Sequence, residues 1–289
     1  MKEGREEQWM GLIYALSAAW LLHTLTQTLL AHVFAHYGMP QLRNYFSGDD
    51  VCDQEGRIAV RVSIAAVQLI AFGATGFAFL RIYFGANAWN SAFSTRIGIG
   101  NVAVAVAAVA IAQPMIQYTI LTPETFVLPW TEWEKHLEKI EERNARLLEN
   151  LLPHDLPMNL LVIAVMPAIM EEVFFRGYML KTLTSLVGIH AAVWVGALLF
   201  AALHFQAFGF VGRTLLGALF GYLTVFSGGN LWPAVAAHFV NNAVYVASAY
   251  FLEIPESSSV RPHPALALAS GVAVVWIVLK LKGKSNLKL

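Results

Sequence analysis

Eight apolar segments of membrane-spanning length dominate this chain of 289 residues. A helix needs about 20 mainly apolar residues to cross the hydrocarbon core of a bilayer, which is roughly 30 Å thick. The pattern also lacks the alternating polarity of barrel strands. We therefore expect an all-α fold, a polytopic transmembrane bundle of about eight spans. The expected spans are 9–36, 58–84, 97–121, 158–181, 187–205, 208–227, 230–252 and 264–281.

Composition excludes most other classes of protein. Only 13% of the residues are charged and 57% are hydrophobic, whereas soluble domains average about 25% and 45–50%. The 19 basic and 19 acidic side chains balance, so no basic field favours a nucleic acid. The single cysteine, Cys52, excludes an internal disulfide and multi-cysteine metal sites. We expect a multi-pass integral membrane protein of the cell (plasma) membrane, with the lipid bilayer as its surroundings.

Three parts are expected along the chain: three spans with an amphipathic segment (1–157), a core of four spans (158–252), and the last span with a basic tail (253–289). The longest polar stretch, 122–157, carries apolar residues at helical spacing and predicts an amphipathic helix at the membrane surface. It could equally pack on the bundle as a lid. Its apolar residues are Trp130, Trp133, Leu137, Ile140, Leu147, Leu148 and Leu151.

An even number of spans places both termini on one side of the membrane. The C-terminal tail carries four lysines and no acidic residue: Lys280, Lys282, Lys284 and Lys288. Basic residues next to spans are enriched on the cytoplasmic side. The sequence therefore predicts cytoplasmic termini.

Three ionisable residues lie within the fourth expected span: Glu171, Glu172 and Arg176. A charged side chain at the bilayer centre costs about 2.5–3.5 kcal/mol on insertion scales, so these groups must face protein or a water-filled cavity. Glu172 and Arg176 are four residues apart with the acid first, the favourable order for an ion pair on one helix face. Glu171 is rotated about 100° away, which leaves it as the candidate general base. A buried ion network that serves only packing is the alternative.

Two further spans supply polar partners. His204 ends the run Phe200-Ala201-Ala202-Leu203-His204, and His238 and Asn242 share one face of the seventh span. Asn241 points elsewhere and is a weaker candidate. Other histidines in the spans, such as His190, are expected to be hydrogen-bonded helix contacts.

In order, Glu171-Glu172-x-x-x-Arg176, Phe200-x-x-x-His204 and His238-x-x-x-Asn242 resemble the motifs of the CPBP family. These are the CAAX-processing and bacteriocin-processing (ABI-like) intramembrane proteases, which include the type II CAAX prenyl endopeptidases. The resemblance covers roughly residues 158–245, including the stretch 229–233 before the last motif.

The resemblance implies an intramembrane endopeptidase that acts on a membrane peptide or a lipid-modified protein, without a cofactor. By position, Glu171 and His204 would activate a water, and His238 and Asn242 would stabilise the oxyanion. Glu172 and Arg176 would support them. Such roles suit peptide hydrolysis, which needs a base for water and donors for the developing negative charge.

Three other interpretations remain open. Zinc could be held by Glu171, His204 and His238 with an open position for water, as in metalloproteases, although the sequence contains no His-Glu-x-x-His motif. The same three residues could form a proton relay in an ion-coupled carrier. A catalytically silent protein, for example one that gives immunity to a peptide toxin, could also keep this fold.

Overall fold

The computed structural model describes residues 2–36, 53–94, 98–121, 139, 142, 145–204, 206, 209–252 and 261–284. Within these ranges the chain folds into helices joined by short connections, with no strand. The all-α bundle predicted from the sequence is confirmed. The helices are α1 (Lys2–His36), α3 (Gln54–Val67), η1 (Gln68–Ala74), α4 (Thr75–Phe84), α5 (Ala88–Ala92), α6 (Ile99–Ile120), α8 (Leu156–Asn159), η3 (Leu160–Val165), α9 (Met166–Glu172), η4 (Val173–Met179), α10 (Leu180–Val187), α11 (Ile189–Ala202), α12 (Phe210–Phe226), α13 (Trp232–Leu252) and α14 (Pro264–Lys284).

Each of the eight expected spans corresponds to a helix or to consecutive helical segments. Five helical stretches in the described residues are long and apolar enough to cross a membrane: 4–36, 54–84, 99–120, 156–187 and 264–283. The apolar helices α11 and α12 are shorter, with 14 and 17 residues. Helix α13 has 21 residues, but His238, Asn241 and Asn242 lower its hydropathy.

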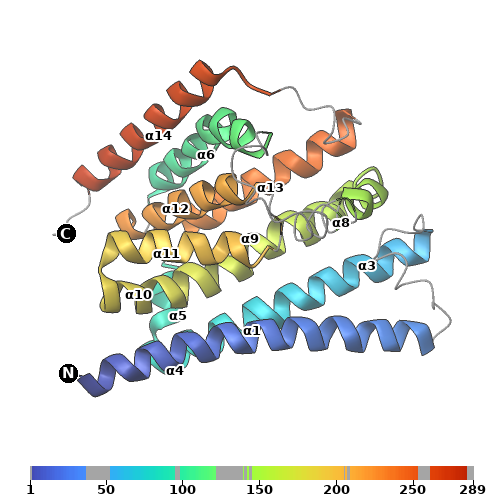
Figure 1. The fold of residues 1–289 in the computed structure, drawn as a ribbon, viewed down its shortest axis with the longest axis horizontal. Helices are drawn as coiled ribbons and strands as arrows, with labels where there is room; N and C mark the ends of the chain where they lie inside the picture. The colour runs from blue at the N-terminus through green and yellow to red at the C-terminus, as the bar shows by residue number, and fades with distance from the viewer. Residues whose placement is uncertain are drawn as a thin grey trace.

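The arrangement in space suits a bilayer. Figure 1 shows the long helices side by side, with the start of α1 and the end of α14 at the same end of the bundle. Large apolar side chains of the outer helices α1 and α14 are exposed, for example Leu29 (65%), Leu268 (71%) and Trp276 (60%). Lipid chains cover such surfaces in a membrane, so the chain is an integral membrane protein.

Three π-helical segments interrupt the second and fourth spans. Segment η1 breaks the second span, and η3 and η4 lie on either side of α9 in the fourth. Each π turn adds a residue to the turn and rotates the side chains that follow, and such turns are frequent at functional sites. Here η4 follows directly after Glu171 and Glu172, the last residues of α9, and η1 begins at Gln68.

Small residues allow α11 and α12 to pack closely. A Cβ atom added at Gly217 would lie 3.0 Å from Cα of Ala197, and one at Gly221 would lie 3.1 Å from Cγ1 of Val193. In a membrane, helices associate through close van der Waals contact of this kind. Packing therefore accounts for both glycines.

The amphipathic segment is described only near its end. Residues 122–138, 140, 141, 143 and 144, which include both tryptophans, lie outside the described residues. Residues 145–151 are helical, and Leu147 and Leu151 pack on Ala59 and Val60 of α3. This end of the segment therefore packs on the bundle. The surface location of the remainder and the three-part division of the chain stay predictions.

The connection that leads into the fourth span is held by a buried arginine of α3. Arg61 donates from Nε to Oδ1 of Asn159 (2.9 Å) and from Nη2 to the carbonyl oxygen of His154 (2.6 Å). Asn159 in turn donates to the carbonyl oxygens of Leu151 and His154. These bonds satisfy the carbonyl oxygen of Leu151, where the preceding helix ends, and that of His154 in the turn after it. The fourth span therefore begins from a fixed position.

Candidate active site

The two consecutive glutamates of the fourth span are buried inside the bundle, with exposed fractions of 6% for Glu171 and 0% for Glu172. The predicted pair of Glu172 and Arg176 is present, because Nη1 of Arg176 lies 3.0 Å from Oε1 of Glu172. Arg176 also donates from Nη2 to the carbonyl oxygen of Gly217 on α12 (2.8 Å). Its guanidinium carbon lies 4.7 Å from the ring centroid of Phe200 on α11. The arginine thus joins the fourth span to α11 and α12.

His238 of α13 contacts both glutamates. Its Nδ1 is 2.9 Å from Oε1 of Glu172, and its Nε2 is 3.9 Å from Oε2 of Glu171. Since a carboxylate accepts hydrogen bonds, Nδ1 carries the proton that His238 donates to Glu172. The ring stacks on Phe220 at a centroid distance of 5.0 Å. The bridging position of His238 was not predicted from the sequence.

Glu171 has a further partner that sequence reasoning missed. Gln68, the first residue of η1, donates from Nε2 to Oε1 of Glu171 at 3.0 Å. A polar side chain inside the apolar second span was the only available signal, and intramembrane polar residues tend to be functional. The carboxylate is therefore held from the second span on one side and lies near His238 on the other.

His204 lies just past the last residue of α11 and is partly buried. Its Nδ1 is 2.8 Å from the carbonyl oxygen of Phe200. A carbonyl only accepts, so Nδ1 carries the proton and Nε2 of the neutral ring can accept one. The ring also lies against Phe200, with the centroids 4.8 Å apart.

Asn242 belongs to a chain of side-chain amides. Gln113 of α6 donates to Oδ1 of Asn241 (3.1 Å), and Asn241 donates to Oδ1 of Asn242 (3.1 Å). Asn242 then donates from Nδ2 to the carbonyl oxygen of Ile163 in η3 (3.2 Å). Asn242 is thereby oriented against the fourth span.

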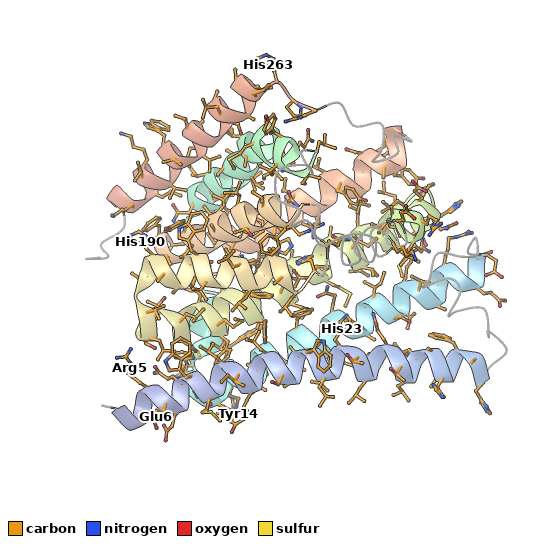
Figure 2. All side chains as sticks on the ribbon, in the orientation of Figure 1. Arg5, Glu6, Tyr14, His23, His190 and His263 are labelled. Carbon is orange, nitrogen blue, oxygen red and sulfur yellow. The ribbon has the colours of Figure 1, made fainter. Side chains whose placement is uncertain are left out.

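The structure brings four of the six predicted residues into direct contact: Glu171, Glu172, Arg176 and His238. Among the described contacts, no hydrogen bond joins His204 or Asn242 to the glutamates. His190, in contrast, bonds the hydroxyl of Tyr222 at 2.9 Å, as expected of a helix contact. Figure 2 shows it where α11 begins, at the end of the bundle that holds Arg5.

Three acceptor atoms of the cluster are buried without a partner in the described part of the chain: Oε2 of Glu171, Oε2 of Glu172 and Oε1 of Gln68. Buried acceptors normally receive a hydrogen bond, and exceptions often mark functional sites. Within the same residues, no three His, Cys, Asp or Glu side chains gather as a metal ion requires. The available acceptors suit a donor such as water.

The part of the chain that holds this cluster is similar to a known family. Residues 153–244 match the family described as Type II CAAX prenyl endopeptidase Rce1-like. We call residues 153–244 the Rce1-like segment. The match confirms the resemblance drawn from the three motifs, and all six predicted site residues lie within the Rce1-like segment. Gln68 and Arg61 lie outside it.

One curated relative has partial similarity to the chain. The uncharacterized protein YpbD of Bacillus subtilis is 28% identical over 141 residues, which cover 47% of this chain and 66% of YpbD. The chain thus matches just under two thirds of that protein's length. No solved structure matches at a significant level.

Proposed function

We propose that this protein is a CAAX-type intramembrane endopeptidase that hydrolyses a peptide bond of a lipid-modified or membrane-associated substrate. The observation that carries the proposal is a buried cluster inside the Rce1-like segment. In it His238 contacts Glu171 and Glu172, and Arg176 pairs with Glu172. Ionisable groups inside a membrane-spanning bundle are costly, and those that are present usually mark functional sites. We place the enzyme in the plasma membrane, where its substrate reaches the site from the bilayer.

Glu171 is proposed as the general base. Its Oε2 is buried, has no hydrogen-bond partner in the described residues, and lies 3.9 Å from Nε2 of His238. A water held there gives one proton to Glu171, and its oxygen forms a bond to the carbonyl carbon of the scissile peptide. His204 assists as a second proton acceptor through Nε2. The proton then passes to the leaving amine as the C–N bond breaks.

His238 and Asn242 are proposed to stabilise the tetrahedral intermediate. A single donor in an oxyanion hole commonly contributes about 10²–10³ in rate. Glu172 accepts the Nδ1–H hydrogen bond of His238 and also one from Arg176. The imidazole is therefore fixed in one orientation. For His238 to donate to the oxyanion as well as to Glu172, Nε2 must also carry a proton.

The proposed reaction needs no cofactor. Chelation separates it from the zinc interpretation, in which Glu171, His204 and His238 would bind the metal and generate hydroxide from its bound water. The proposed partners are the bilayer and a peptide or lipid-modified protein.

The test is cleavage by the purified, detergent-solubilised protein of three peptides: a prenylated CAAX peptide, its unprenylated counterpart and an unmodified membrane-spanning peptide. Each is incubated with and without a strong chelator, and Glu171→Gln purified in parallel controls for contaminating proteases. We expect chelator-resistant cleavage of the prenylated peptide by the wild type alone. Loss of cleavage on chelation, restored by zinc, would contradict the metal-free mechanism. Cleavage of only the unmodified peptides would contradict the CAAX-type substrate.

A further inference from the structure

Among the described hydrogen bonds of Glu171, the one from outside the Rce1-like segment comes from Gln68. Its Nε2 donates to Oε1 of Glu171 at 3.0 Å, across 103 residues of sequence. The other atom of its amide, Oε1, is buried without a partner in the described residues. Packing alone does not account for an amide here, because an apolar side chain of the same size would avoid the unsatisfied acceptor.

The backbone around Gln68 is fixed against the fourth span by two glycines. A Cβ atom at Gly73 would lie 2.5 Å from Sδ of Met170, the residue before Glu171. One at Gly76 would lie 2.9 Å from Cα of Phe174. These close approaches hold the second span in one register on the fourth, and they fix the distance from Gln68 to Glu171. The π turn that begins at Gln68 contributes to the same alignment.

A hydrogen bond to one carboxylate oxygen restricts rotation of the whole group. With Oε1 of Glu171 held by Gln68, Oε2 is the oxygen that faces Nε2 of His238. A base in a dry site must present one oxygen to its water, and small misplacements reduce the rate strongly.

We propose that Gln68 is a positioning residue for Glu171, directing Oε2 of its carboxylate toward the attacking water beside His238. The inference rests on the proposed function and deepens it. The proposed active site then includes a residue of the second span in addition to those of the Rce1-like segment.

Two variants and one matched control test the role. Gln68→Met keeps the size of the side chain and removes the donor. Gln68→Glu keeps the shape and places a second carboxyl against Glu171. The control, Ser63→Ala, removes a buried hydrogen bond to the carbonyl oxygen of Ala59 in the same span, with no contact to a glutamate. Values of kcat and KM are measured per mole of folded enzyme, with thermal stability measured in parallel.

We expect Gln68→Met to lower kcat by about 10- to 100-fold, as for loss of a hydrogen bond to a charged group. KM should change by less than about threefold, because the bond acts on the reacting group and not on substrate binding. Gln68→Glu should lose at least as much, and Ser63→Ala should keep the kcat of the wild type.

The inference is overturned if Gln68→Met keeps its kcat, or if its loss appears only in KM or in the folded fraction. Cleavage by the wild type, none by Glu171→Gln and an unchanged Gln68→Met would contradict this inference alone. A folded wild type that cleaves no peptide would contradict the proposed function and this inference together.

Discussion

Replacing Glu172 by glutamine leaves a guanidinium buried without its counter-charge. Arg176 has an exposed fraction of 3%, and its Nη1 lies 3.0 Å from Oε1 of Glu172. At that distance, two unit charges attract by about 5–6 kcal/mol if the effective dielectric constant is near 20. The glutamine oxygen can still accept a hydrogen bond, which returns about 1 kcal/mol. We therefore expect Glu172→Gln to lower the free energy of unfolding by about 3–5 kcal/mol, the range for broken buried pairs.

The assay is equilibrium unfolding in mixed micelles, followed by circular dichroism. The double variant Glu172→Gln/Arg176→Met removes the stranded charge and should regain most of the lost free energy, without regaining activity. Glu55→Gln, at an exposed acid in the first turn of α3, is the control and should unfold like the wild type. The reasoning is refuted if Glu172→Gln unfolds within about 1 kcal/mol of the wild type, or if the double variant is no more stable than the single one.

Two further predictions concern the proposed oxyanion site and the connection before the fourth span. Asn242→Ala should lower kcat by about 10²–10³, whereas His204→Ala should abolish turnover of the folded protein; equal residual rates in single-turnover measurements would contradict their separate roles. Arg61→Met removes the bonds to Asn159 and to the carbonyl oxygen of His154, and should cost about 1–3 kcal/mol of stability. It should also speed proteolysis between residues 145 and 155, and an unchanged cleavage rate would show that Arg61 does not hold this connection.

Hydropathy was enough to predict the bundle, because each apolar run must satisfy its own backbone hydrogen bonds in lipid and therefore forms a helix. The same local logic predicted the pair of Glu172 and Arg176, which lie one helical turn apart. The fifth span was predicted as far as residue 205, but α11 ends at Ala202, so His204 follows the helix.

Contacts between helices far apart in the chain could not be predicted from the sequence. The bond from Gln68 to Glu171 depends on the π turn of η1 and on the register set by Gly73, and neither has a signal in hydropathy. The double contact of His238 depends likewise on how α13 packs on the fourth span. A single polar residue in an apolar span indicates that a partner exists, but not which residue it is.

The most direct test of the account is the turnover of a cleavable peptide by wild type and Glu171→Gln reconstituted side by side in liposomes. The two side chains have nearly the same size, so folded yield and thermal stability should match while the proton acceptor is lost. The account predicts that cleavage by Glu171→Gln falls to the rate of protein-free liposomes. Substantial cleavage by a folded Glu171→Gln would show that Glu171 is not the base, and would contradict the mechanism.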